Sequence, residues 1–237
     1  LVKKWETDTT LKVPESVLYD EKNKVLYVTN IAGTDPWAED GNGSVAKVGL
    51  DGKIISAEWV TGMNSPKGMG LYKGKLYVAD LKNVLVIDVA SGKIDTKIEL
   101  SAAQGLNDVS IDENGVVYVS DMPGKKIWRI ENGKQEGFLE NLNRPNGVLA
   151  HKKEFFVLDN GTLFKLGKDK ALVKITDGME GGTDGIENVG GNDYIVSCWA
   201  GSIWHVSADG TKTNLLDTRE QKINTADIGY DAKNRIV

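Results

Sequence analysis

The sequence has few of the residues that supply soft metal ligands and strong nucleophiles. It contains one cysteine, Cys198, and two histidines, His151 and His205, among 237 residues. A single cysteine excludes an internal disulfide and a thiolate metal cluster. We interpret Cys198 as a buried small apolar residue and not as a nucleophile. The histidines fall in a turn and in a strand-like segment, so we expect surface or packing roles for both.

Long apolar runs and concentrated positive charge are also absent. The longest apolar runs are about five to seven residues, as in VLVIDVA, whereas a membrane span needs roughly twenty. Lysines and arginines are scattered singly, and the net charge is -5. Such a chain has no cluster of basic residues that could bind the phosphate backbone of a nucleic acid. We therefore expect no membrane span and no nucleic-acid partner. No export signal is evident, so the compartment stays open.

Short strand-like segments recur at a spacing near forty residues, and helical periodicity is absent. Six of them begin alike, at residues 14, 66, 106, 145, 183 and 225: PESVLYD, PKGMGLY, LNDVSID, PNGVLAH, TDGIENV and TADIGYD. The first five are each followed by three further segments rich in β-branched and aromatic residues. Four antiparallel strands per repeat are typical of a propeller blade. The sequence therefore predicts an all-β, six-bladed β-propeller in which residues 1–237 form a single domain.

The sixth repeat differs from the others because it stops at NRIV, inside its second strand. The chain opens with LVKKWETD, a strand-like segment that belongs to no complete repeat. We expect this N-terminal segment to supply the outer strand of the last blade. That blade would then be truncated, and from the length of the repeat we expect the native protein to continue about twenty residues past Val237.

A ring of polar residues is expected at one mouth of the central channel, because the innermost strands of all blades start at the same face. The second residues of the six repeats are Glu15, Lys67, Asn107, Asn146, Asp184 and Ala226. Two carboxylates and two carboxamides in this set are oxygen donors, which favours a hard cation such as Ca²⁺ over zinc or copper. Lys67 is either a substrate-facing cation or a solvated channel lysine. Asp227, next to Ala226, could also reach inward, whereas Asp108 is interpreted as an acceptor for backbone N–H groups.

Loops that join second and third strands should overhang the same mouth. The first of them, IAGTDPWAEDGNGS, is the longest and contains Trp37. Trp37 either caps a ligand or anchors its own loop, and Trp199 either caps a ligand or packs between blades. Selectivity is expected in these loops and metal binding in the strand starts.

These motifs resemble the senescence marker protein, gluconolactonase and luciferin-regenerating enzyme family over essentially the whole chain. The matching residues are Glu15 in PESVLYD, Asn107 and Asp108 in LNDVSID, Asn146 in RPNGV and Asp184 in TDGIE. The resemblance implies a six-bladed propeller with one divalent metal in its channel. It also implies that Glu15, Asn146 and Asp184 hold the metal, that Asn107 contacts metal or substrate, and that Asp184 is the general base.

One departure limits what the resemblance implies about the substrate. Members that hydrolyse sugar lactones usually carry an arginine two residues before the asparagine of the ND pair, and this sequence has Gly105 there. The metal site is therefore expected, whereas specificity for sugar-acid lactones is not.

Two functions remain open at this point. The first is a metal-dependent hydrolase, with Ca²⁺ as the metal, acting on a lactone or similar cyclic ester as its small-molecule substrate. Its catalytic residues would be Asp184, Asn107 and Lys67, and its metal ligands Glu15, Asn146, Asp184 and Asn107. The alternative is a non-catalytic, metal-containing propeller that binds a small molecule or a protein partner, because one fold hosts both classes.

Overall fold

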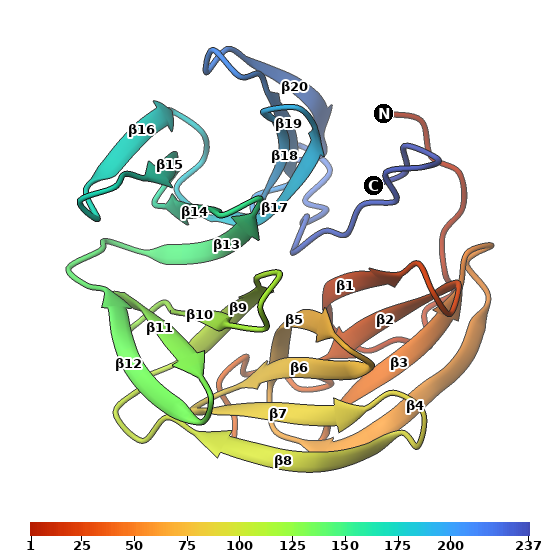
Figure 1. Ribbon diagram of the computed structural model, residues 1–237. Coiled ribbons are helices and arrows are strands. Elements are labelled where there is room, and N and C mark those ends of the chain that lie inside the picture. Colours follow the sequence, from red (N-terminus) through yellow and green to blue (C-terminus); the bar gives the residue numbers. More distant parts are fainter.

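Five four-stranded antiparallel sheets are arranged around a central axis in the computed structural model, which describes residues 1–237 (Figure 1). The first blade contains β1 (Pro14–Asp20), β2 (Val25–Asn30), β3 (Gly43–Gly49) and β4 (Ile54–Met63). The second contains β5 (Pro66–Tyr72), β6 (Lys75–Asp80), β7 (Asn83–Asp88) and β8 (Lys93–Glu99). The third contains β9 (Leu106–Ile111), β10 (Val117–Asp121), β11 (Lys126–Glu131) and β12 (Lys134–Leu139). The fourth contains β13 (Pro145–His151), β14 (Glu154–Asp159), β15 (Thr162–Leu166) and β16 (Leu172–Thr176). The fifth contains β17 (Thr183–Gly190), β18 (Asp193–Cys198), β19 (Ser202–Val206) and β20 (Lys212–Asp217).

Apolar side chains of the middle strands form the core between neighbouring blades. One cluster joins Tyr27 and Val45 of the first blade to Leu76 and Val78 of the second, and similar clusters lie between each later pair. The fourth strands are on the outside, and most residues of β8 are exposed. Neighbouring blades therefore cover both faces of the inner strands, whereas the outer strands are exposed to solvent.

The prediction of six blades is wrong, because the sixth repeat does not form a sheet. Residues 225–237 contain a single isolated bridge, between Asp231 and Ile236. They follow the inner edge of the ring, where the Asp227 N–H donates to the Glu15 carbonyl at 3.1 Å. A lone hairpin is marginal without further strands to pair with. Residues 225–237 thus share the sequence pattern of an inner strand and lie beside β1, but they form no blade.

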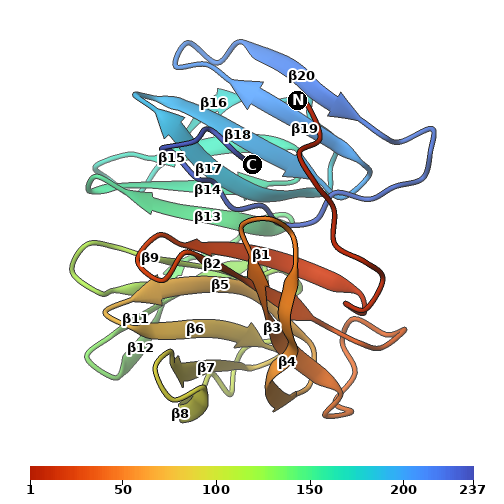
Figure 2. The ribbon, with the colours of Figure 1, turned by 90° about the vertical axis from the view of Figure 1, so that its right-hand side faces the viewer.

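The N-terminal segment also departs from expectation, because residues 1–13 form no strand. The amino group of Leu1 donates to the Leu215 carbonyl on β20 at 3.2 Å, and the indole of Trp5 packs against Gly52 in the first blade. Figure 2 shows this segment running from the fifth blade down to the first. It therefore spans the interval between the two end blades without closing a sheet.

The fold is entirely β, as predicted, and residues 1–237 contain no helical segment. Accordingly, no helix is long and apolar enough to cross a membrane.

Candidate functional site

The second residue of each inner strand lies in a buried ring at one end of the channel. The inner strands β1, β5, β9, β13 and β17 are neighbours in space. Their second residues are Glu15, Lys67, Asn107, Asn146 and Asp184, and each is at most 9% exposed. Ala226 adds no side-chain donor, and its carbonyl accepts a hydrogen bond from Ser197 Oγ at 2.7 Å.

Two members of the ring are in direct contact. Asn146 Nδ2 donates to Asp184 Oδ1 at 2.9 Å, which fixes the amide so that its oxygen points away from that carboxylate. The other carboxylate oxygen, Asp184 Oδ2, accepts no hydrogen bond within the chain. The pair therefore presents one amide oxygen and one carboxylate oxygen to a further group.

Burial and neighbouring carboxylates raise the pKa values of both carboxyl groups in the ring. The pKa of Glu15 is well above its usual range, first because of burial and then because of the Asp184 charge. The pKa of Asp184 rises to about 8, again through burial first and then through the charge of Asp227. Two desolvated carboxyls so close together favour a cation between them or a proton on one of them.

Lys67 is a buried channel residue, so the interpretation of a solvated lysine is wrong. It is 2% exposed, and its Nζ lies 4.6 Å from the ring centroid of Trp37. Burial lowers the pKa of Lys67, while the charges of Glu15 and Asp184 oppose that shift. The ammonium is therefore placed between an aromatic face and the two carboxyl groups of the ring.

The residues present fit a hard cation. Two buried oxygen atoms, Glu15 Oε2 and Asn146 Oδ1, have no hydrogen-bond partner. Leaving such acceptors unsatisfied is costly, and a cation would satisfy both. No cluster of three or more His, Cys, Asp or Glu side chains is suited to a metal, so any ion here would need amide oxygens beside the two carboxylates.

The third residues of the inner strands hold the strands together. Asp108 Oδ2 accepts from the Val148 N–H of the next blade at 2.8 Å, and its Oδ1 accepts from Val109 N–H at 2.7 Å. This confirms the interpretation of Asp108 as a structural acceptor. Asp227 is held similarly, by Ser16 Oγ at 2.5 Å and by Ile228 N–H at 2.8 Å, and does not point freely into the channel.

Glycine at the third position allows close approach between inner strands. A Cβ on Gly147 would lie 2.1 Å from the Asp184 carbonyl oxygen, and one on Gly185 would lie 2.3 Å from Asp227 Oδ1. Any larger residue would push the strands apart. These contacts bring the second residues of adjacent strands close enough to form the ring.

Three aspartates that end second strands fix the segments leading into the ring, and sequence reasoning missed them. Asp80 accepts from Ser65 N–H at 2.7 Å, Asp121 from Gly105 N–H at 2.9 Å, and Asp159 from Arg144 N–H at 2.6 Å. The signal was visible as YVAD, YVSD and FVLD in the same register of three repeats. The corresponding residues of the first and fifth blades are Asn30 and Cys198.

The long loop of the first blade, residues 31–42, lies over the mouth. Ser65 Oγ donates to the Ala38 carbonyl at 3.0 Å, which ties the loop to the start of the second blade. Trp37 reaches farther, to Gly105 in the third blade. Trp199 is 47% exposed, which contradicts the option that it packs between blades.

A cavity of about 780 Å³ occupies the opposite end of the channel, lined by apolar and polar residues of the inner strands and of the turn after β1. Glu187 on β17 faces it and forms no hydrogen bond, and burial raises its pKa to about 8. Sequence reasoning missed this carboxyl. It is three positions beyond Asp184, outside the register that was compared between repeats.

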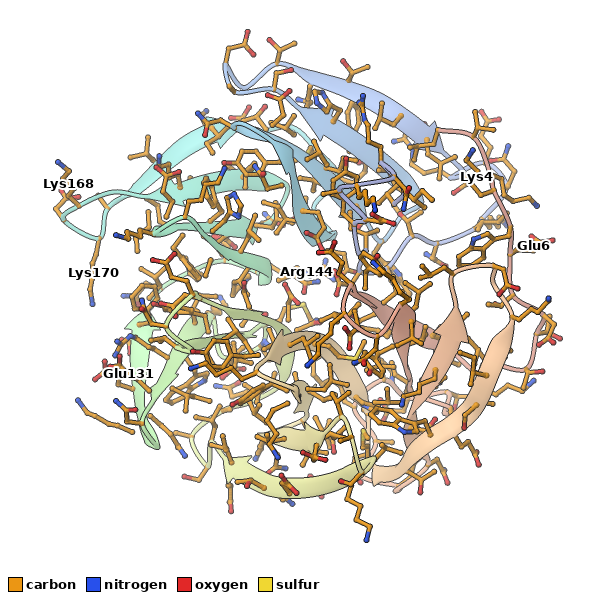
Figure 3. All side chains as sticks on the ribbon, turned by 45° about the vertical axis from the view of Figure 1, so that its right-hand side comes forward. Lys4, Glu6, Glu131, Arg144, Lys168 and Lys170 are labelled. Carbon is orange, nitrogen blue, oxygen red and sulfur yellow. The ribbon has the colours of Figure 1, made fainter.

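The remaining candidates of the sequence lie away from the ring. Cys198 is fully buried, and burial raises the pKa of its thiol to about 12, as suits a packing residue. His205 is 3.3 Å from Asp193 on the neighbouring strand. Figure 3 shows Arg144 near the middle of the propeller, whereas Glu131, Lys168 and Lys170 lie at its outer edge.

Residues 13–219 match the family profile described as the SMP-30/Gluconolactonase/LRE-like region. The chain belongs to this SMP-30/gluconolactonase/LRE-like family. The match runs from just before β1 to just after β20 and thus includes every residue of the polar ring. No curated protein matches the chain.

Solved structures similar to this SMP-30/gluconolactonase/LRE-like protein share its fold at low identity. A nidogen/laminin complex aligns with a TM-score of 0.76 and 16% identity, covering 92% of this chain and 84% of the other. A streptogramin B lyase aligns with a TM-score of 0.70 and 12% identity, covering 96% and 90%. A catalytically inactive virginiamycin B lyase from Staphylococcus aureus with quinupristin gives 0.66 and 12%, covering 96% and 93%. At such identities the likeness concerns the fold alone.

Proposed function

We propose that the chain is a hydrolase of a lactone or similar cyclic ester that requires one divalent cation, Ca²⁺, at the polar mouth of the channel. The observation that carries this proposal is the pair of buried, unpartnered oxygens, Glu15 Oε2 and Asn146 Oδ1, beside the Asp184 carboxyl. Membership of the SMP-30/gluconolactonase/LRE-like family supports it. Glu15, Asn146 and Asp184 would hold the cation, with Asn107 as a further oxygen donor. When bound, the cation would polarise the ester carbonyl and stabilise negative charge on its oxygen.

Asp184 is suited to take a proton from the attacking water. Its Oδ1 is fixed by Asn146, whereas its Oδ2 has no partner within the chain and is free to accept from water. A general base must reach its proton by hydrogen bonding, and monodentate use of one oxygen leaves the other for that task. Burial and Asp227 raise the pKa of Asp184 to about 8 without a cation, and a bound cation would favour the ionised carboxylate that accepts the proton.

Asn107 and Lys67 would position the substrate. Asn107 is in the same buried register on β9, and its amide can donate to one ester oxygen while accepting from a donor on the substrate. Lys67 supplies positive charge beside the two carboxyls and limits their repulsion. Its ammonium would also favour the charge that develops on the ester oxygen.

A panel of simple lactones, assayed with Ca²⁺ and with a chelator, tests the proposal. Hydrolysis in Ca²⁺ that stops with chelator and returns with added Ca²⁺ is expected. Asp184→Asn should abolish it, whereas Glu131→Gln on the outer surface should not. The absence of lactone hydrolysis under every metal condition, in protein shown to bind Ca²⁺, would contradict the hydrolase and favour the binding function.

The binding function remains the second candidate. Its support is the likeness to a propeller solved within a nidogen/laminin complex, which is a protein–protein assembly. In that case Glu15, Asn146 and Asp184 would still bind Ca²⁺, and Asp184→Asn would change metal affinity without removing any activity.

A further inference from the structure

The loop of residues 31–42 is a fixed part of the mouth, although it belongs to the first blade. Ser65 Oγ donates to the Ala38 carbonyl, and Asn64 Oδ1 accepts from Gly41 N–H at 3.2 Å. The loop is also braced internally, because Trp37 N–H donates to Asp35 Oδ1 at 2.9 Å. The segment after Trp37 is thus tied to the beginning of the second blade, and Trp37 itself is bonded to Asp35 before it, so the indole has a defined position.

Trp37 forms the wall of the mouth next to Asn107. A Cβ on Gly105 would lie 2.6 Å from Trp37 Cζ3 and 3.0 Å from Pro123 Cγ, so the indole fills the space that a side chain at 105 would need. Gly105 is two residues before Asn107 and its N–H is bonded to Asp121. The atoms nearest to Gly105 on this side of the ring are therefore carbon atoms of the Trp37 indole and of Pro123.

One cation lies over the indole, and two backbone N–H groups near it are already hydrogen-bonded. Lys67 Nζ lies over the ring of Trp37 and faces the carboxyls of Glu15 and Asp184. The backbone N–H groups of Ser65 and Gly105 are bonded to Asp80 and Asp121. A substrate hydroxyl pressed against the carbon edge of the indole that faces Gly105 would lose water and gain no partner from those carbon atoms, which is unfavourable. An alkyl group there would lose only unfavourable contact with water.

We propose that Trp37 is a specificity-determining residue that selects cyclic esters with an apolar ring face or an alkyl substituent over polyhydroxylated ones. This inference rests on the proposed function for its catalytic step. The selection itself is a property of binding, because it depends on the indole and not on the base. Trp37 is half-buried, so part of the indole is still open at the mouth for such a contact.

The experiment compares an alkyl-substituted δ-lactone with glucono-δ-lactone, which has the same ring size, in saturating Ca²⁺. We expect kcat/KM to favour the alkyl lactone by at least about tenfold. Trp37→Ala should lower kcat/KM for the alkyl lactone by roughly ten- to hundredfold, mainly through KM, and leave the sugar lactone unchanged or improved. Trp37→Phe should retain most of the preference. Trp5→Ala, which removes an indole packed against Gly52 in the turn between β3 and β4, is the matched control and should change neither substrate.

Binding of the corresponding lactams, measured by calorimetry in Ca²⁺, separates this inference from the proposed function. Alkyl lactam that binds wild type and not Trp37→Ala supports the selection by Trp37 even where no lactone is hydrolysed, an outcome that would refute only the hydrolase. Equal binding of alkyl and polyhydroxylated lactams, no binding of either, or an equal loss of both in Trp37→Ala would overturn the inference. Ca²⁺ affinity is measured in each variant to show that the ring is intact.

Discussion

The two ends of the inner strands each contain a carboxyl group with a raised pKa, but they surround it with different partners. At the starting end, polar residues of five strands converge, and Asp184 has an amide neighbour and a nearby ammonium. At the far end, a cavity with both polar and apolar lining residues contains Glu187, which forms no hydrogen bond. Burial raises the pKa of each carboxyl to about 8. A shifted pKa therefore marks burial at both ends, and only the partners around Asp184 make its end a candidate catalytic site.

The largest expected effect is on catalysis and separates the two carboxylates at the polar end. Asp184→Asn should remain about 10² to 10⁴ slower than wild type even at saturating Ca²⁺, because the base is lost. Glu15→Gln removes a charge without removing the base, so much of its activity should return at high Ca²⁺. Rates across a Ca²⁺ titration measure this difference. Equal recovery of both variants would mean that Asp184 acts only as a ligand.

A stability effect should follow the third residues of the same strands. Asp108→Ala leaves the buried N–H groups of Val109 and Val148 without an acceptor, at about 1–3 kcal/mol each. We expect a loss of about 2–4 kcal/mol in the free energy of unfolding, measured by urea denaturation. Glu113→Ala, in the exposed turn after β9, should be nearly neutral. An unaffected midpoint in Asp108→Ala would contradict the bridging role.

Adding Ca²⁺ should stabilise the polar end and, through it, the whole fold. A ligand at one hundred times its Kd adds about 2.7 kcal/mol, which for a chain of this size is several degrees in Tm. Differential scanning fluorimetry should show Tm rising with Ca²⁺ and falling with chelator. The double variant Glu15→Gln/Asp184→Asn is the control and should not respond. A similar rise in Tm in that variant would mean that Ca²⁺ binds at another site.

The smallest effect concerns Glu187 and depends on pH. Its pKa is raised from an ordinary 4.5 to about 8, so the folded protein holds a proton that the unfolded chain has released within this window. Stability should therefore fall as pH rises from about 5 to 8. Glu187→Gln should remove this slope, so that its urea midpoint no longer falls as pH rises over this range. Identical slopes in both proteins would show that Glu187 ionises normally.

Blade starts and the polar ring could be predicted from the sequence because both follow the repeat. PKG, LND, PNG and TDG each place their second residue at the start of an inner strand, and strand alternation gives all of them the same direction. Strands such as β6 and β10 were recognisable from their β-branched and aromatic residues. The position of each ring residue can thus be predicted from the few residues around it, in a pattern that recurs about every forty residues.

Three features could not be predicted from the sequence, for physical reasons. Residues 225–237 carry the pattern of a blade start, but a sheet also requires partner strands, and the pattern does not encode whether they are there. The contact between Trp37 and Gly105 joins loops of the first and third blades, and no periodicity relates them. Lys67 could not be assigned as buried for the same reason, since the indole that covers it comes from another repeat.

The aspartates that end β6, β10 and β14 limit local motion in the segments that lead into the polar ring. Because Asp80, Asp121 and Asp159 bond the amides of Ser65, Gly105 and Arg144, these amides should exchange with deuterium slowly although they lie outside the strands. Asn30 and Cys198 give the first and fifth blades no such acid. Local opening at the polar end of the channel should therefore be greatest in the first and fifth blades. The inner strands of the other three blades hold their side chains in place before a ligand binds.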